Sequence, residues 1–197
     1  MEETSGTNSP AMHDFLSPGG GSLTNNGKLS TSGDNSAGMA ALTSDDTLVN
    51  NGTITTTGAG SHGLLANGGA AGGPGNNVVT NNGTIDVSGA NAHGITSLDS
   101  SPGVVTNTGS IAASGPGGLG AFIAGRVTLD NAAGASIVSQ QDNGIDANGG
   151  GTFNNAGTIS GHNVALSLVG AAATINNSGT LQGASRRPLF RTMHRIS

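Results

Sequence analysis

The sequence predicts an all-β protein, a parallel β-helix (solenoid) of about seven coils. Three observations predict it. One short motif recurs along most of the chain, glycine and other small residues dominate the composition, and the larger apolar residues occupy fixed places in the motif. A repeat this short cannot bury its own apolar side, whereas stacked repeats bury these sides against one another. The backbone of each coil then pairs with the coils on either side.

The recurring motif reads apolar-x-Asn-x-Gly-x-(Ile or Leu) in six copies, and a seventh, from Leu129 to Ile137, carries two extra residues. Its closing residues are 22 to 31 residues apart. Side chains two residues apart on a strand share a face, and Thr, Val and Ile favour strands. The opening positions should therefore form one internal column: Leu23, Leu48, Val79, Val105, Leu129, Phe153 and Ile175. The closing positions should form a second: Leu29, Ile54, Ile85, Ile111, Ile137, Ile159 and Leu181.

The Asn-x-Gly step of the motif is expected at a corner of each coil, because Asn and Gly tolerate positive φ. Stacked asparagines can bond amide to amide from one coil to the next, as identical amides do in stacked sheets. We expect such a structural ladder at Asn25, Asn50, Asn81, Asn107, Asn131, Asn155 and Asn177. The alternative is a solvated turn, which the neighbouring glycine would suit equally well.

A second motif, glycine followed by an apolar residue, predicts a further strand in several coils. Its copies are Gly38-Met39, Gly63-Leu64, Gly94-Ile95 and Gly144-Ile145, with Gly120-Ala121-Phe122 as a looser match. Threonines between the motifs, such as Thr56, are expected at the surface.

The composition excludes several classes of protein. The chain has 36 glycines, 9% charged residues and no cysteine, so neither a disulfide framework nor a thiolate metal site is possible. The aromatic residues are Phe15, Phe122, Phe153 and Phe190. Between Phe15 and Gly183, two basic residues stand against eight aspartates. An acidic body without Trp or Tyr is a poor nucleic-acid binder.

Composition divides the chain into three segments. Residues 1–21 precede the first motif and are expected to be disordered, residues 22–183 hold the β-helix repeats, and residues 184–197 form a basic tail. This tail suits a truncated or frame-shifted gene product better than an interaction segment, because it is short and contains a proline. The glycine-rich run from Asn67 to Asn76 coincides with the longest repeat and predicts a mobile insertion at a coil corner.

Carboxylates occur in two groups that could carry chemistry. Asp45 and Asp46 with Asp99 could pair as they do in polysaccharide-cleaving β-helices, but the body lacks the basic and aromatic side chains that such enzymes also use. The run from Asp142 through Asp146 to Asn148 is the nearest set of oxygen ligands for calcium. Residues of these types are more often plain turn residues in a glycine-rich segment.

Two histidines occupy equivalent places in adjacent repeats. His62 and His93 each precede the Gly-apolar motif, so in register their rings should stack about one strand spacing apart. A metal needs more ligands than two imidazoles, and the sequence offers none in matching context. We therefore expect no metal and no cofactor.

The repeated Val-x-Asn-x-Gly-Thr-Ile, followed by a small-residue stretch such as Ser88 to Ile95, resembles the passenger domain of bacterial autotransporters (type V secretion) over about residues 22–183. The resemblance implies a right-handed parallel β-helix and display at the outer membrane of a Gram-negative bacterium by a C-terminal β-barrel. This sequence contains neither that barrel nor a signal peptide, and no apolar stretch approaches the length of a membrane helix. A fragment of a longer surface protein is expected.

We expect a non-catalytic cell-surface scaffold that acts in adhesion or self-association, because no nucleophile–base pair or complete metal shell can be assembled from its residue types. Its partners would be a host or bacterial surface ligand or further copies of itself, and not nucleic acid. The first alternative is the scaffold part of an enzyme-bearing passenger whose catalytic domain lies outside this chain. The second is a free intracellular solenoid or a non-functional gene fragment.

Overall fold

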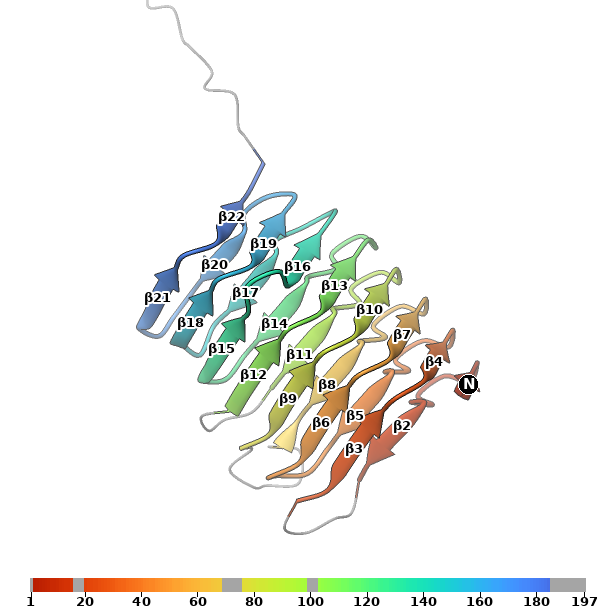
Figure 1. Cartoon of the computed structure of the whole chain (residues 1–197). Coiled ribbons are helices and arrows are strands. Elements are labelled where there is room, and N and C mark those ends of the chain that lie inside the picture. The colour runs from red at the N-terminus through yellow and green to blue at the C-terminus, as the bar shows by residue number, and fades with distance from the viewer. Residues whose placement is uncertain (1, 16–19, 69–75, 99–102, 185–197) are drawn as a thin grey trace, which may run out of the picture.

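The chain winds as a β-solenoid of about seven turns (Figure 1). The structure, a computed structural model, describes residues 2–15, 20–68, 76–98 and 103–184. Strands that follow one another in sequence belong to three different sheets, and strands three apart lie side by side. Every pairing between described strands is parallel, as in β10 with β7 and β13. The prediction of a parallel β-helix is confirmed.

The three sheets, called A, B and C here, form the sides of the coils. Sheet A runs in the order β1 (Glu2–Thr4), β4 (Lys28–Thr31), β7 (Thr53–Thr56), β10 (Thr84–Val87), β13 (Ser110–Ala113), β16 (Ser136–Ser139), β19 (Thr158–Gly161) and β22 (Thr180–Gln182). Sheet B runs β2 (Met12–Asp14), β5 (Met39–Ala41), β8 (Leu64–Ala66), β11 (Ile95–Ser97), β14 (Ala121–Ile123), β17 (Ile145–Ala147) and β20 (Leu166–Leu168). Sheet C runs β3 (Ser22–Asn25), β6 (Thr47–Asn50), β9 (Val78–Asn81), β12 (Gly103–Asn107), β15 (Val127–Asn131), β18 (Gly151–Asn155) and β21 (Ala173–Asn177).

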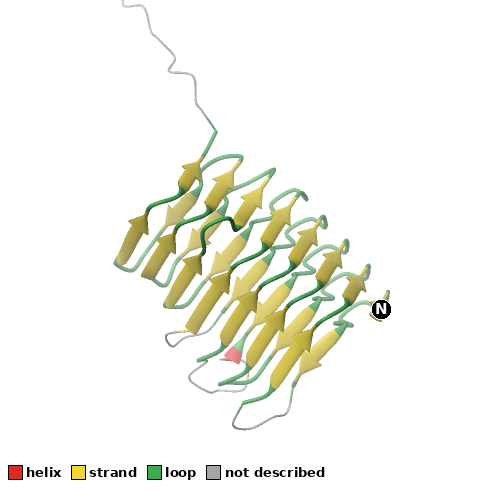
Figure 2. Cartoon of the chain, viewed as in Figure 1, coloured by secondary structure: helices red, strands yellow, loops and turns green. Residues whose placement is uncertain are grey.

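Loops and turns join the strands, with one short helical turn at Gly68 (Figure 2). Within the part of the chain that the structure describes, no helix has the length and apolar character needed to cross a membrane.

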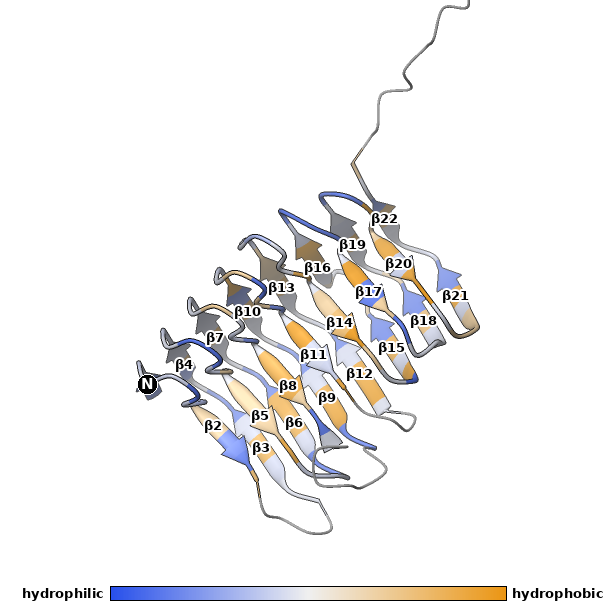
Figure 3. Ribbon diagram, turned by 180° about the vertical axis from the view of Figure 1, so that it is seen from behind, coloured by the Kyte–Doolittle hydropathy of each residue, from blue (hydrophilic) through white to orange (hydrophobic). Residues whose placement is uncertain are grey.

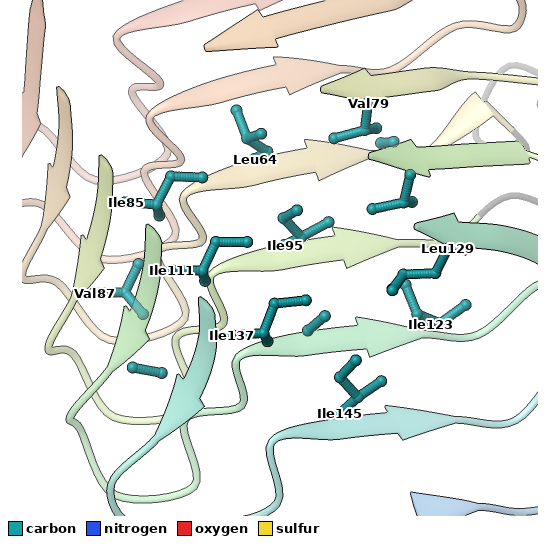
Figure 4. Close-up of a cluster of buried hydrophobic side chains, with 14 of the residues drawn as sticks. Leu64, Val79, Ile85, Val87, Ile95, Ile111, Ile123, Leu129, Ile137 and Ile145 are labelled. Atoms are coloured by element: carbon teal, nitrogen blue, oxygen red, sulfur yellow. The ribbon is translucent and has the colours of Figure 1, made fainter. Parts of the chain in front are cut away.

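The predicted internal columns are present in register. In sheet C, Leu23 pairs with Leu48, and the same column continues without a slip to Ile175. In sheet A, Leu29 pairs with Ile54 and the column continues to Leu181. Side chains of the central coils are fully buried and interdigitate between the sheets (Figure 4). Those of the last coil are exposed, Ile175 by 47% and Leu181 by 39%.

The Gly-apolar motif begins the strands of sheet B. Met39, Leu64, Ile95, Ala121 and Ile145 form a third buried column. The looser copy is therefore in register, with Ala121 inside and Phe122 on the outer face.

The expectation of positive φ at the corner glycine holds for the seventh motif copy, at Gly134, and does not hold for the other copies, such as those with Gly52, Gly83 and Gly109. At these three glycines close packing of the coils is the requirement instead. A Cβ built on Gly83 would overlap the carbonyl oxygen of Gly52, and one on Gly109 would overlap that of Gly83. Each coil passes so close to the previous one at this corner that a side chain has no room.

The N-terminal segment is ordered into a coil over residues 2–14, where the sequence predicted disorder across 1–21. Strand β1 pairs with β4 and β2 pairs with β5, so Met12 extends the column of Met39. The segment lacks the repeat motif, but the open edge of the first complete coil supplies backbone partners that do not depend on side-chain identity. Residues 185–197 of the predicted tail, Asp99 and most of the Asn67–Asn76 run lie outside the described residues.

The burial pattern of sheet A predicts a sharp contrast between neighbours on β16. Ile137 is fully buried, whereas Val138 faces outward and is half-buried. Replacing Ile137 with alanine should lower the free energy of unfolding by about 2–5 kcal/mol through lost burial and the cavity left behind. The change Val138→Ala should cost about 1 kcal/mol or less. Urea denaturation of both variants measures the difference, and equal costs would contradict the assigned faces.

Candidate functional site

The seven corner asparagines form one continuous ladder of side-chain amides. Asn25 Nδ2 donates to Asn50 Oδ1 at 2.8 Å, Asn50 Nδ2 donates to Asn81 Oδ1 at 2.8 Å, and the pattern continues to Asn177. All bonds run in the same direction, with the amide nitrogen pointing toward the C-terminal coil. The structure thus has the ladder in place of the alternative solvated turn.

The ladder amides of Asn25 and Asn50 also close their own corners. Asn25 Oδ1 accepts the backbone N–H of Gly27 at 2.9 Å, and Asn50 Oδ1 accepts that of Gly52 at 3.3 Å. The six asparagines from Asn25 to Asn155 are buried, so their amides depend on protein partners for hydrogen bonds. A buried amide left without these partners costs free energy, which makes the ladder a structural element of the core. Asn177, at the last coil, is exposed.

Two further rows of polar side chains run outside this corner, and our sequence reasoning missed both. In the first, Asn51 Nδ2 donates to Asn26 Oδ1 at 2.9 Å and Asn82 Nδ2 donates to Asn51 Oδ1 at 2.8 Å. The bonds of this exposed row point toward the N-terminal coil, opposite to the inner ladder. The doubled Asn-Asn in these motif copies was a signal for it, since adjacent residues at a corner can stack separately.

The second outer row lines an open groove of about 420 Å³ near the C-terminal coils. Asn154 Nδ2 donates to Asp130 Oδ1 at 2.5 Å, and Asn176 Nδ2 donates to Asn154 Oδ1 at 2.7 Å. The groove therefore presents one carboxylate and two amides in a line along the solenoid. Such a row can hydrogen-bond a polar ligand, but it contains no base–nucleophile pair.

The outer face of sheet B carries a different groove, of about 380 Å³, over the first coils. Its apolar walls include Pro10, Leu42 and Leu65, and Phe15 stands beside it with 59% of its surface exposed. Figure 3 views the solenoid from this side. An apolar groove with an exposed aromatic ring is typical of a contact surface.

His62 and His93 stack as the sequence predicted. Their ring centroids are 5.0 Å apart and the rings are nearly parallel, and Phe122 lies against His93 at 5.7 Å. Each Nδ1 accepts a backbone N–H from the next coil, His62 from His93 and His93 from Leu119, both at 3.1 Å. The imidazoles therefore act as acceptors that tie one coil to the next.

This environment favours neutral histidines. Burial, and then repulsion from His93, lowers the pKa of His62 from 6.5 to about 4. Burial also lowers the pKa of His93, partly offset by the nearby carboxylates of Asp146 and Asp142. Protonation at Nδ1 would remove the acceptor for the next coil's backbone.

The candidate carboxylates are engaged in structure. Asp46 is buried, and its carboxylate accepts the backbone N–H of Gly21 at 2.6 Å and the Thr43 hydroxyl at 2.7 Å. Asp45 is exposed, has positive φ and accepts the amide of Asn76. Asp46 is thus turned away from Asp45 and solvent, and the pair offers no shared site.

The suggested calcium ligands likewise bind amides. Asp146 accepts the side chain of Asn143 at 2.7 Å, and Asp142 accepts that of Asn163 at 3.0 Å. Over the residues with described positions, no group of three or more His, Cys, Asp or Glu side chains could hold a metal ion.

Thr56 is not at the surface, and this part of the sequence interpretation was wrong. Thr56 is fully buried, and its hydroxyl donates to the carbonyl of Ser61 at 2.5 Å. It lies two residues after Ile54 and so shares the inward face of the strand. The bond to a nearby loop carbonyl removes the cost of burying the hydroxyl.

The ladder predicts different consequences at two adjacent asparagines. Replacing Asn81 with alanine leaves buried partners above and below without a bond and should cost about 1–3 kcal/mol of unfolding free energy. Replacing the exposed Asn82 with alanine should cost less than about 0.5 kcal/mol. Denaturant titration of both variants decides the matter, and equal, negligible costs would show that the inner ladder does not stabilise the fold.

The buried histidine pair predicts that the protein becomes less stable at acidic pH. Because the folded pKa of His62 lies below its unfolded value of 6.5, the unfolded chain binds more protons between pH 6.5 and about 4. The free energy of unfolding should therefore fall over this window, by about 1–3 kcal/mol, and be unaffected by this group above pH 7.

The matched variant is His62→Asn. An asparagine already serves at the equivalent place of a later coil, where Asn143 Oδ1 accepts the backbone N–H of Val164 at 3.2 Å. This variant keeps an acceptor but does not titrate, so its loss of stability from pH 7 to 4 should be smaller. Identical losses in the two proteins would contradict the role given to His62.

Comparison with known proteins gives a family. A protein-family model described as the BigA third pectate lyase-like domain matches residues 2–121, more than half of the chain. Strands β15 to β22 continue the same stacking beyond the matched region. No curated protein and no solved structure matched the chain. BigA is a bacterial surface protein, and this chain belongs to the family of its third pectate lyase-like domain.

Proposed function

We propose that this β-helix domain is a non-catalytic scaffold on a bacterial cell surface, acting in adhesion or self-association. The observation that most supports this proposal is that a carboxylate and two imidazoles, which could act in catalysis, instead accept hydrogen bonds within the fold. Asp46 accepts backbone and hydroxyl donors, and His62 and His93 accept backbone N–H groups. What the domain offers outward is an apolar groove lined in part by Phe15 and a row of exposed side-chain amides, which suit contact with a surface.

We further propose that the domain is the passenger part of an autotransporter, displayed at the outer membrane. The motif Val-x-Asn-x-Gly-Thr-Ile supports this origin, and the family's link to a bacterial surface protein is consistent with it.

A second candidate is a scaffold within an enzyme that acts on polysaccharides. The groove beside Asp130 favours it, since a carboxylate and two amides along an open groove could bind a sugar chain. Catalysis would then require residues beyond this groove, which holds no second carboxylate or basic group among its lining residues.

Display of the chain on non-adherent bacterial cells through an unrelated anchor tests the proposal. Cells carrying the domain should adhere or settle together more than cells carrying the anchor alone. The purified chain should turn over no pectate or related polysaccharide. If the chain turns over a polysaccharide and the variant Asp130→Asn does not, the enzyme scaffold is the correct function. If cells that display the domain adhere no more than cells with the anchor alone, the role in association is contradicted.

A further inference from the structure

The exposed row of corner asparagines contains two copies of the acceptor motif for N-linked sugars. This motif is Asn-x-Ser/Thr, in which x is any residue except proline. It occurs in adjacent coils as Asn51-Gly52-Thr53 and Asn82-Gly83-Thr84. The third asparagine of the row, Asn26, is followed by Gly27-Lys28 and so lacks the hydroxyl residue. A further copy, Asn176-Asn177-Ser178, begins inside strand β21 and belongs to the other outer row.

Both copies in the corner row lie on the surface of the solenoid. Asn51 and Asn82 are exposed and stand in the turns that join sheet C to sheet A. Thr53 and Thr84 begin the next strands at outward, partly exposed positions, and they pair with each other in register. Both ends of each motif are therefore open to an enzyme that approaches this corner.

The bonding of the outer amides differs from that of the inner ladder. An asparagine Nδ2 carries two hydrogens. Within the described chain, Asn51 Nδ2 donates a single bond, to Asn26 Oδ1, and Asn82 Nδ2 donates one to Asn51 Oδ1. The buried Asn50 Nδ2 instead donates to Asn81 Oδ1 and to two backbone carbonyls. Each outer amide of the motif thus keeps one N–H that can be replaced without breaking the row, whereas the inner amide has none to spare.

We propose that Asn51 and Asn82 are acceptor sites for an N-linked sugar. A glycosyltransferase supplies this sugar from a donor in which the anomeric carbon is joined to a diphosphate. Nδ2 forms a bond to the anomeric carbon, the bond from that carbon to the diphosphate oxygen breaks, and the diphosphate leaves with the electron pair. One amide proton is released, and the remaining N–H still donates to the neighbouring Oδ1. The bulky, solubilising sugar then projects from the corner into solvent, as suits a bacterial surface protein.

Peptide mapping by mass spectrometry tests the proposal on the full chain, purified from the bacterium that makes it. After nonspecific digestion, peptides with Asn51 and Asn82 should carry the added mass of a sugar, and peptides with Asn26 should not. A single sugar unit would support the proposal with a nucleotide-linked donor, and a preassembled oligosaccharide would support it with a lipid-linked donor. The absence of sugar from both Asn51 and Asn82, or its presence on Asn26, would overturn the proposal.

Substitutions of the third motif residue make the test specific. Thr53→Ala should lose the sugar at Asn51, whereas Thr53→Ser should keep it, because serine also completes the motif. The matched variant Lys28→Thr completes the motif in the neighbouring coil, since Lys28 pairs with Thr53, and sugar should then appear on Asn26. Circular dichroism should show unchanged β-structure in all three variants. Sugar retained on Asn51 in Thr53→Ala, or no sugar on Asn26 in Lys28→Thr, would each overturn the assignment.

Discussion

Every coil of this protein must lie directly over the one before it. The sheets pair in parallel without a slip, so each side chain meets the residue at the same place in the next coil. The residue type at each position therefore depends mainly on the residue that lies at the same place in the neighbouring coil. Where coils approach closely a glycine is needed, as at Gly52 and Gly83, and where an amide points inward its neighbour must be an amide too.

This constraint explains why polar groups lie in the core of so small a solenoid. A single buried asparagine would leave its amide without partners, but a column of them supplies a donor for every acceptor. The histidines and Asp46 follow the same logic with backbone N–H groups as donors. The outward faces that the columns do not use remain available for contact with other molecules.

The sequence predicted the columns correctly because their periodicity survives repeats of unequal length. Extra residues enter loops between strands, so Val79 remains in register with Leu48 across the longest repeat. The N-terminal coil could not be predicted, since β1 and β2 lack the motif and are held by backbone pairing to the coil beside them. Thr56 was misplaced because its polarity was given more weight than its place two residues after Ile54. The outer groove at Asp130 could not be predicted from the sequence, because it depends on which corners of the coils lie side by side.

The inner asparagine ladder is a buried, hydrogen-bonded part of the fold on which the stacking of the coils depends. Hydrogen exchange of the side-chain amides, followed by NMR, tests this role most directly. The Nδ2 protons of Asn81, Asn107 and Asn131 should exchange at least about tenfold more slowly than those of Asn51 and Asn82, because buried amides exchange only when the coils open. Equal exchange of the inner and outer amides would contradict the ladder as the element that holds the coils in register.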